Sequence, residues 1–456
     1  FFFIFFLSMT DEEKKELPTT EETSLSKAAK KRQRKKKNKA KLQAVEVKEV
    51  DYWNQPIDVD QSAVETNSKE FKKGSLKEYE FWKDQPVPQF SDNVEGKNEP
   101  IEPGIPVSEV QKDPYPLNSV LEWCQVDLMN STELEELYQL LTENYVEDAG
   151  CTFRFDYSVE FLRWALTPPG WLKKWHIGVR VKQNKKLVGF ISAIPADLRS
   201  YNKVIPLVEI NFLCVHKKLR DKRIAPILIQ EVTRQVHLTN RWQAVYTAGK
   251  LLPRPVAICR YYHRSLNPKK LVEVGFSGLG PRSTMSMQVK LYRVPTEPKI
   301  PGIRLMENKD LDGVYTLLTG YLNKFKVAPV FTKDDVEHFF IPRPGVINSY
   351  VVENPETNEI TDFMSFYTLP SSISGNPKYN TLKAAYSYYN VATSVSLKDL
   401  MYDALILAKQ EDFDVFNALD LMDNEEFLEP LKFGVGDGKL RYYLYNWNSP
   451  TIASKD

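Results

Sequence analysis

The sequence predicts an α/β protein in which two related halves follow a disordered basic tail. Three observations support this prediction. The order helix, hairpin, strand, helix, strand occurs twice, a proline-rich joint (Pro295–Pro301) separates the two copies, and residues 1–75 lack apolar periodicity. Hydrophobic residues make up 42% of the 456 residues, which is enough to bury a large core.

The first copy begins at about Leu121. Ser131–Val146 shows helix-period apolar residues and opens with the Ser–x–x–Glu spacing of a capping box. Alternating residues on both sides of Gln183–Asn184 predict a hairpin over Trp175–Ser200. The remaining elements are a buried strand Val208–His216, a helix that begins just after Pro226 and runs to Leu238, a strand Gln243–Gly249, and Ser286–Val294, which closes this half.

The second copy repeats the order after the proline-rich joint. Its helix is expected over Leu311–Phe325, and its hairpin over Ser349–Leu369 turns at Asn358. The elements that follow are a strand Leu382–Thr393, a helix Leu397–Glu411, and final strands Asp414–Leu419 and Arg441–Trp447. Because identity between the copies is low, the repeat is inferred from the order of elements alone.

Charge is distributed unevenly along the chain. The formal net charge is +1, but Lys27–Lys41 holds ten basic residues, and without them 51 basic residues face 60 acidic ones. A mildly acidic body therefore carries a basic tail. We expect this tail to contact a polyanion such as a ribosome, RNA or an anionic membrane. A solvated solubility tail or a nuclear-localisation-like run is the alternative.

Composition also indicates the compartment. The apolar run Phe1–Leu7 is too short to span a bilayer and lacks the basic residues of a signal peptide, so we expect it to precede a true start at Met9. Four scattered cysteines do not form a disulfide framework, which favours a reducing environment. We expect a cytoplasmic, monomeric protein, in part associated with ribosomes or membranes. An extended arm rich in aromatic residues and proline, starting at Glu78, should bury Phe81 and Trp82 against the body.

The stretch after the buried strand of the first half predicts an anion site. A basic turn, His216–Arg223, leads from that strand into the helix near Ala225–Pro226. Free amides at a helix N-terminus, the helix dipole and cations together suit a phosphate or pyrophosphate. The alternative is a solvent-facing basic turn. The turn contains five cations: Lys217, Lys218, Arg220, Lys222 and Arg223.

Other chemical motifs are weak. The glycine-rich Gly434–Gly438 precedes alternating strand residues instead of the helix that a Walker loop needs, so a flexible hairpin or specificity loop is expected. The five histidines show no metal-ligand spacing, and we expect no metal and no cofactor. Cys214 lies within an apolar strand, where a packed thiol is expected, although a nucleophilic Cys–His pair stays open.

Several long motifs resemble the glycylpeptide N-tetradecanoyltransferase (N-myristoyltransferase) family, of the animal type. They are FWKDQPVP (Phe81–Pro88), EINFLCVHKKLRDKRIAPILIQEVTRQVH (Glu209–His237), YTAG (Tyr246–Gly249), RYYHRSLNP (Arg260–Pro268), LKAAYSYYNV (Leu382–Val391) and KFGVGDGKLRYYLYNW (Lys432–Trp447). The resemblance implies two fused acetyltransferase-like (GNAT) halves in a pseudo-twofold arrangement. Residues 76–295 would bind acyl-CoA and residues 296–456 the peptide.

The resemblance also implies a reaction and its residues. Myristate would pass from myristoyl-CoA, a co-substrate, to the N-terminal glycine amine of peptides and nascent proteins, by direct attack on the thioester. Backbone amides of Phe212 and Leu213 would hold the oxyanion, and Asn211 and Thr247 the amine. The implied acyl-CoA site comprises Tyr79, Glu80, Phe81, Trp82, Phe212, Leu213, Cys214, Val215, Arg220, Asp221, Arg223 and Ala225. The implied peptide site comprises Tyr145, Glu147, Asp148, Tyr261, His263, Ser371, Tyr386, Asp437 and Gly438.

Three positions depart from the family pattern. The family's base is a C-terminal α-carboxylate that follows an apolar segment, whereas this sequence ends in the polar Thr451–Asp456, which suggests a truncated end and low activity for this form. Asp221 stands where the family usually has Ser, so Asp221→Ser should lower the KM for acyl-CoA. The acidic run after Tyr145 is reduced to Glu147 and Asp148, so selection for a lysine in the peptide should weaken.

Two other functions remain open. An acyltransferase of the same fold could use lysine side chains as acceptors or another acyl length, and competing acyl-CoAs and acceptors would separate these. A degenerate, non-catalytic body whose basic tail binds RNA or ribosomes is the second alternative.

Overall fold

The computed structural model describes residues 79–146 and 152–456. The predictions for the tail, including Lys27–Lys41, lie outside the described residues, as do those for Glu147 and Asp148. Among the helices that the structure describes, none is long and apolar enough to cross a membrane.

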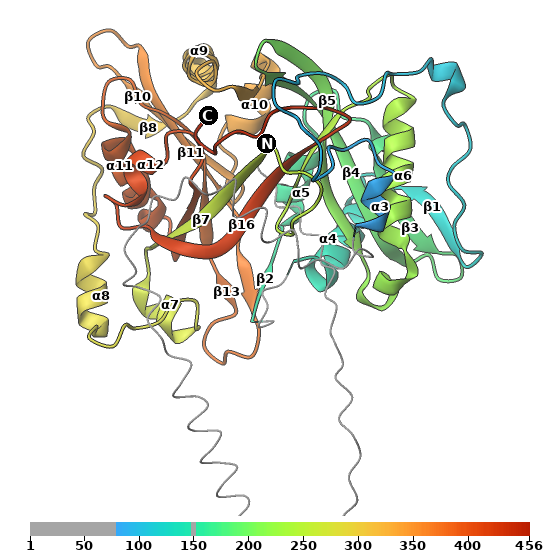
Figure 1. Ribbon diagram of the computed structural model, residues 1–456. Coiled ribbons are helices and arrows are strands. Elements are labelled where there is room, and N and C mark those ends of the chain that lie inside the picture. The colour runs from blue at the N-terminus through green and yellow to red at the C-terminus, as the bar shows by residue number, and fades with distance from the viewer. Residues whose placement is uncertain (1–78, 147–151) are drawn as a thin grey trace, which may run out of the picture. The chain divides into compact units, whose positions relative to one another are not determined.

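One mixed sheet runs through the described part of the chain (Figure 1). Its strands, in spatial order, are β1 (Leu121–Gln125), β3 (His176–Val181), β4 (Leu187–Ser200), β5 (Lys203–Val215), β6 (Ala244–Ala248), β16 (Gly434–Tyr445), β7 (Ala257–Ser265), β15 (Val415–Leu419), β14 (Ala384–Val391), β11 (Ile360–Thr368), β10 (Ile347–Glu353) and β8 (Ile303–Leu305), while β9 (Val327–Pro329) pairs with β4. A second sheet holds β13 (Thr381–Leu382), β12 (Ser371–Ile373) and β2 (Phe153–Phe155).

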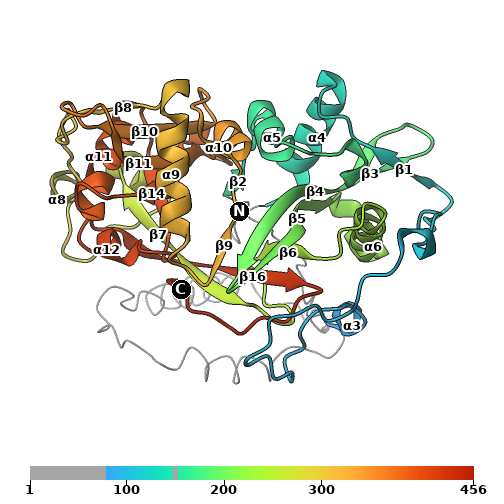
Figure 2. The same cartoon turned by 90° about the horizontal axis from the view of Figure 1, so that it is seen from above.

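The large sheet is arranged symmetrically about its two central strands. Its parallel pairs are β5 with β6 on one side and β14 with β15 on the other. The antiparallel pair β16–β7 lies between them. Going from either edge of the sheet toward this pair, the strands are antiparallel to one another until the single parallel pair of that side. β16 comes late in the sequence but pairs with β6 of the first half, and β7 comes early but pairs with β15 of the second. Figure 2 shows the two halves side by side with these exchanged strands between them.

Helices cover both faces of the sheet. The α-helices are α3 (Glu80–Lys83), α4 (Ser131–Asn144), α5 (Val159–Leu166), α6 (Ile224–His237), α7 (Pro268–Glu273), α8 (Met285–Leu291), α9 (Leu311–Leu322), α10 (Lys333–Phe340), α11 (Leu397–Gln410) and α12 (Glu425–Leu428). Short 3₁₀ turns are η1 (Val107–Glu109), η2 (Lys173–Trp175), η3 (Lys217–Lys222) and η4 (Asn308–Asp310). One core joins α4 and α5 of the first half to α9 and α10 of the second, whereas α6 and α11 have cores of their own.

The α/β class and the repeated order of elements agree with the sequence prediction. Local differences remain. Asn130, not Ser131, caps α4, because its side-chain oxygen accepts the amide protons of Thr132 and Glu133. α6 begins at Ile224, so Pro226 lies inside its first turn, where a missing N–H has no helical partner to lose.

Other elements were missed or assigned differently. Gly434–Gly438 is the start of β16, not a hairpin. The segment expected to close the first half, Ser286–Val294, forms α8. The strands β1 and β7 and the helices α5 and α10 were not predicted.

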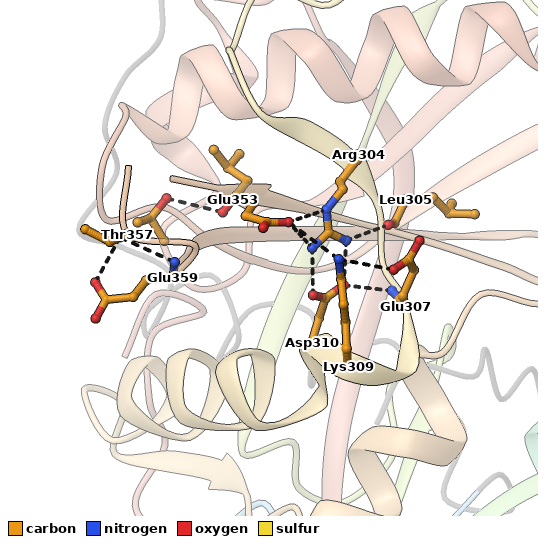
Figure 3. Close-up of polar contacts among 10 residues, drawn as sticks. Arg304, Leu305, Glu307, Lys309, Asp310, Glu353, Thr357 and Glu359 are labelled. Atoms are coloured by element: carbon orange, nitrogen blue, oxygen red, sulfur yellow. Dashed lines mark hydrogen bonds and ion pairs between the residues drawn. The ribbon is translucent and has the colours of Figure 1, made fainter. Parts of the chain in front are cut away.

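An ion-pair network fixes the edge strand of the second half (Figure 3). Arg304 on β8 donates to Asp310 Oδ2 at 2.7 Å and, through Nε, to Glu353 Oε2 on β10 at 2.7 Å. Asp310 is 3% exposed and also accepts the amide proton of Glu307 at 2.8 Å, closing a capping box. The guanidinium therefore connects an edge strand, its neighbour and the start of α9.

Candidate functional site

A bulge in β5 lies at the centre of the candidate site. In the pairing of β5 with β4, Ser192 faces Asn211 and Phe190 faces Cys214, so Ile191 faces both Phe212 and Leu213. The backbone of Phe212 accommodates the extra residue of the bulge by adopting φ +52°, a conformation that a bulky residue rarely adopts. The two residues of the bulge are those whose backbone amides the family resemblance assigns to the oxyanion, an assignment that stays a prediction.

Hydrogen bonds from Asn211 hold the bulge in place. Asn211 Oδ1 accepts the amide proton of Phe212 at 2.9 Å, and its backbone oxygen accepts from Ser192 Oγ at 2.9 Å. Asn211 is 2% exposed, and its Nδ2 has no hydrogen-bond partner in the described part of the chain. The amide of Phe212 is thus already used by its neighbour, and it becomes available to an oxyanion only if the Asn211 side chain turns.

β5 and β6 separate at the same point. Their parallel pairing covers Val208 with Ala244 and Glu209 with Val245. Asn211 and Thr247 follow this pairing by two residues, one on each strand, and both are buried. Two parallel strands that part beside a bulge expose backbone groups that a continuous ladder would satisfy. The buried side chains of Asn211 and Thr247 therefore lie on neighbouring strands at the point where these strands separate.

A small apolar cavity lies on one face of the separated strands. Its walls include Ile191 and Ile210, which flank the bulge, and Trp82, whose ring stacks on Tyr246 with centroids 5.6 Å apart. Trp82 is buried, so the arm lies against the body as predicted, while Phe81 is half-buried and Glu80 exposed. Tyr79, half-buried, packs edge-on against Phe90 at 5.4 Å. The cavity suits an apolar chain that begins at the bulge.

The basic turn follows β5 directly. η3 carries Lys217 to Lys222, and Arg223 adopts φ +55° immediately before α6. Asn144 at the end of α4 fixes the turn, because its Oδ1 accepts the Lys217 amide proton at 3.0 Å and its backbone oxygen accepts from Arg220 at 2.6 Å. The side chains of Lys218, Lys222 and Arg223 are exposed, as is Asp221, while Ala225 is half-buried in α6. The strand–turn–helix order is therefore confirmed, and the binding of an anion there stays a prediction.

Cys214 packs in the core. Burial raises the pKa of its thiol to about 12, and its Sγ points to the Leu140 carbonyl oxygen at 3.9 Å. A thiolate nucleophile is disfavoured there. Val215, also buried, faces the core under α6.

A cluster of aromatic residues extends from the bulge toward the second half. Phe212 contacts Tyr145 at 5.7 Å and Tyr157 at 5.1 Å between ring centroids. Tyr386 stacks on Tyr367 at 5.3 Å. Burial raises the pKa of Tyr157, Tyr367, Tyr386 and Tyr261, so these hydroxyls stay neutral across the usual pH range.

The second half contributes polar groups beside these rings. His263 shares a 2.6 Å hydrogen bond between Nδ1 and Asn417 Oδ1, which makes Nδ1 the donor. Burial lowers the pKa of His263, so Nε2 of the neutral ring is an acceptor. Three residues of β16, Gly436–Gly438, stand opposite the single Tyr261 of β7, and this wide bulge brings the exposed Asp437 near His263. Ser371 lies in the small sheet opposite Phe155, whose ring reaches Tyr386 at 6.4 Å.

Several residues of this region were missed by sequence reasoning. Tyr157, Phe155 and Tyr367 line the aromatic cluster, and the alternating aromatics of Phe153–Phe155 were an available signal. Glu209 is a buried acid among the apolar residues at the centre of β5, and burial raises its pKa. A charged residue within such a strand was the signal that could have found it.

The arrangement is that of an acyl-transfer site: distorted backbone, an apolar cavity behind it and a basic turn suited to phosphates. A family model described as myristoyl-CoA:protein N-myristoyltransferase, N-terminal domain, matches residues 100–259, and its C-terminal counterpart matches residues 273–456. The chain belongs to the myristoyl-CoA:protein N-myristoyltransferase family.

Individual relatives agree with this assignment. Glycylpeptide N-tetradecanoyltransferase 1 of Arabidopsis thaliana is 57% identical over 396 residues, which cover 86% of this chain and 91% of that protein. The Drosophila melanogaster glycylpeptide N-tetradecanoyltransferase is 53% identical over 380 residues, covering 83% and 80%. A crystal structure of Saccharomyces cerevisiae N-myristoyltransferase with bound myristoyl-CoA has a TM-score of 0.80 and 45% identity, covering 83% of this chain and 95% of that one. Plant and animal relatives are similarly close, so the animal type stays a prediction.

Proposed function

We propose that this protein transfers myristate from myristoyl-CoA to the N-terminal glycine amine of peptide and nascent protein substrates. The observation that carries the proposal is the bulge at Phe212 and Leu213, with the apolar cavity on one side and the basic turn following it. In this arrangement the acyl chain fills the cavity, the CoA phosphates lie at η3 and the N-terminus of α6, and the thioester lies at the bulge.

The proposed reaction is direct amide formation. The neutral amine attacks the thioester carbon, the carbonyl oxygen becomes an oxyanion, and the CoA thiolate leaves as the C–S bond breaks. Backbone amides at Phe212 and Leu213 stabilise the oxyanion once Asn211 releases the first of them. Thr247 and Asn211, on the two separated strands, orient the amine. The proton acceptor proposed is a C-terminal α-carboxylate, as the family resemblance implies.

The division of labour between halves is part of the same proposal. Residues 76–295 supply the cavity and the basic turn, and residues 296–456 supply most of the polar groups beside the aromatic cluster. Tyr145, Tyr261, His263, Ser371, Tyr386, Asp437 and Gly438 would receive the peptide. We further propose that the enzyme is monomeric and cytoplasmic. We also propose that its basic tail contacts a ribosome or a membrane.

The test is transfer of labelled myristate by the full chain. A glycine-initiated peptide is compared with the same peptide acetylated at its N-terminus and with one whose only amine is a lysine side chain. Label on the free glycine amine alone is expected. Label on the lysine peptide would favour the alternative acceptor, and no transfer to any acceptor would leave the non-catalytic alternative. Chain lengths from decanoyl to palmitoyl should show a preference set by the cavity.

A further inference from the structure

α8 is a well-anchored helix that buries none of its side chains. Met287 is 56% exposed, and Val289, Leu291 and the preceding Leu279 are also exposed. The end of the helix is nevertheless fixed, because Lys432 Nζ donates to the Leu291 carbonyl at 3.1 Å and Arg264 donates to the Tyr292 carbonyl at 3.3 Å. The Arg264 guanidinium also lies 4.7 Å from the centre of the Tyr292 ring. Apolar side chains are thus held in water by a rigid support.

Basic residues lie in the same stretch of the chain as these apolar side chains. Between residues 274 and 296 the sequence holds Arg282, Lys290 and Arg293 and no aspartate or glutamate. All three cations are exposed. This stretch is therefore a basic exception within an acidic body. We call Leu279, Met287, Val289 and Leu291 together with these three cations the α8 surface.

α8 lies at the edge of the second half in both views, and Figure 1 shows α7 beside it. The loop that carries Leu279 also carries Phe276, whose ring contacts His263 at 5.5 Å and Phe153 at 5.8 Å. This loop thus connects α8 with the candidate peptide site. α8 itself buries none of its side chains.

We propose that the α8 surface binds an anionic lipid bilayer. Met287 and Leu291, four residues apart and therefore on one face of α8, enter the boundary between headgroups and acyl chains, while the three cations contact anionic headgroups. A bilayer needs no shape complementarity, which fits a helix that buries none of its side chains. The contact is independent of the acyl-transfer chemistry and of the tail. It places the candidate peptide site next to the bilayer that a lipid-modified product would enter.

The experiment measures partition of the full chain between buffer and vesicles of phosphatidylcholine with or without phosphatidylserine. Two variants remove the surface: Met287→Gln with Leu291→Gln, and Arg282→Gln with Lys290→Gln and Arg293→Gln. Two matched controls alter equally exposed positions elsewhere: Val120→Gln with Met129→Gln, and Lys83→Gln with Lys97→Gln and Lys112→Gln. Because every protein keeps the tail, differences report the α8 surface alone. Hydrogen exchange of the α8 amides with and without vesicles supplies a local readout.

The expected result is binding to phosphatidylserine vesicles that falls about tenfold or more in either α8 variant and stays unchanged in the controls. Vesicles should slow exchange of the α8 amides in the wild type. Acyl transfer to a soluble peptide should be equal in all variants. Absence of transfer in every protein, the wild type included, would count against the proposed function and not against this contact, whereas loss in the α8 variants alone would contradict the independence of the contact from the chemistry. Unchanged vesicle binding in both α8 variants overturns the proposal. Sedimentation that shows α8-dependent self-association without lipid also overturns it, in favour of a second copy of the chain.

Discussion

Asn211 Oδ1 accepts the amide proton of Phe212 at 2.9 Å, so a side chain occupies one of the two backbone donors at the β5 bulge. The carboxamide also presents a buried Nδ2 without a partner in the described part of the chain. One residue therefore both restrains the strained strand and offers a donor to the opening.

Replacing Asn211 with Asp tests this dual role. The carboxylate still accepts the Phe212 amide proton, but it removes the Nδ2 donor and adds negative charge where an oxyanion would form. We expect kcat, measured below the melting temperature, to fall about 100-fold, and the melting temperature to fall as well because the carboxylate is buried without a cation among the residues that the structure describes. Steady-state kinetics and calorimetry measure the two quantities. A wild-type kcat would exclude Asn211 from the reaction.

Trp82→Ala should widen the apolar cavity. The indole is 7% exposed and stacks on Tyr246, which in turn stacks on Tyr443 at 5.0 Å. We expect a loss of about 3 kcal/mol in unfolding free energy and a preference shifted toward longer acyl chains. Trp82→Phe serves as the control, with a smaller effect on both. If the alanine variant kept the wild-type preference for acyl-chain length, the cavity beside Trp82 would not be the site that binds the acyl chain.

Gly436→Ala should act through His263. A Cβ at position 436 would lie 2.5 Å from His263 Nε2, so the imidazole must shift and weaken its bond to Asn417. We expect a higher KM for peptide and an unchanged KM for acyl-CoA. Gly278→Ala is the matched control, since nothing lies within 4 Å of its Cβ position. Equal peptide KM values in the two variants would contradict the role given to His263.

The free energy of unfolding should fall as the pH is lowered below about 6.5, because His176 is buried in its neutral form. Burial lowers the pKa of this imidazole from 6.5 to about 4, so the unfolded chain binds a proton that the folded chain does not. The contribution of the neutral His176 to the free energy of unfolding is fully present above about pH 6.5 and disappears as the pH falls toward 4. The free energy of unfolding thereby changes by about 3 kcal/mol. His176→Phe keeps the stack on Trp171, whose centroid is 5.4 Å away. Urea unfolding at several pH values should show a flatter acid limb in the variant, and parallel curves would refute the assignment.

Arg304→Met should leave the buried Asp310 carboxylate without its main cation. Because Arg304 remains partly exposed, we expect a moderate loss of about 2 kcal/mol in unfolding free energy, with acyl transfer unaffected at temperatures below melting. Adding Asp310→Asn should recover part of this loss, since the neutral amide no longer needs a counter-ion. A double variant that is less stable than the single one would contradict this account.

Local patterns in the sequence predict most regular elements but not their long-range pairing. The hairpins at Gln183–Asn184 and at Asn358 are confirmed because turn chemistry and alternation are local signals. β7 was missed because its stability comes from β15 and β16, which lie far away in the sequence. α8 was not recognised because its residues face water, so no apolar stripe marks it.

The same limit applies to the site. The basic turn and the strand before it could be predicted because the residues adjoin in sequence. The bulge at Phe212 depends on which residue of β4 pairs with which of β5, and the aromatic cluster joins Tyr157 to Tyr367 across the fold. Those relationships arise only when the sheet forms. The residue types in the sequence therefore indicate the kind of chemistry. The pairing register of β4 with β5 determines where in the fold that chemistry can occur.

The exchange of β7 and β16 has a consequence for biosynthesis. The first half lacks the partner of β6 until Gly434–Tyr445 has left the ribosome, so an open strand edge persists while residues 249–445 are synthesised. Cleaving the joint at Pro295–Pro301 after folding should likewise leave the two fragments associated, because each fragment contributes a strand to the other. The two halves can be told apart by the order of their elements along the chain. Because they exchange strands, we expect them to fold and unfold together as one cooperative unit.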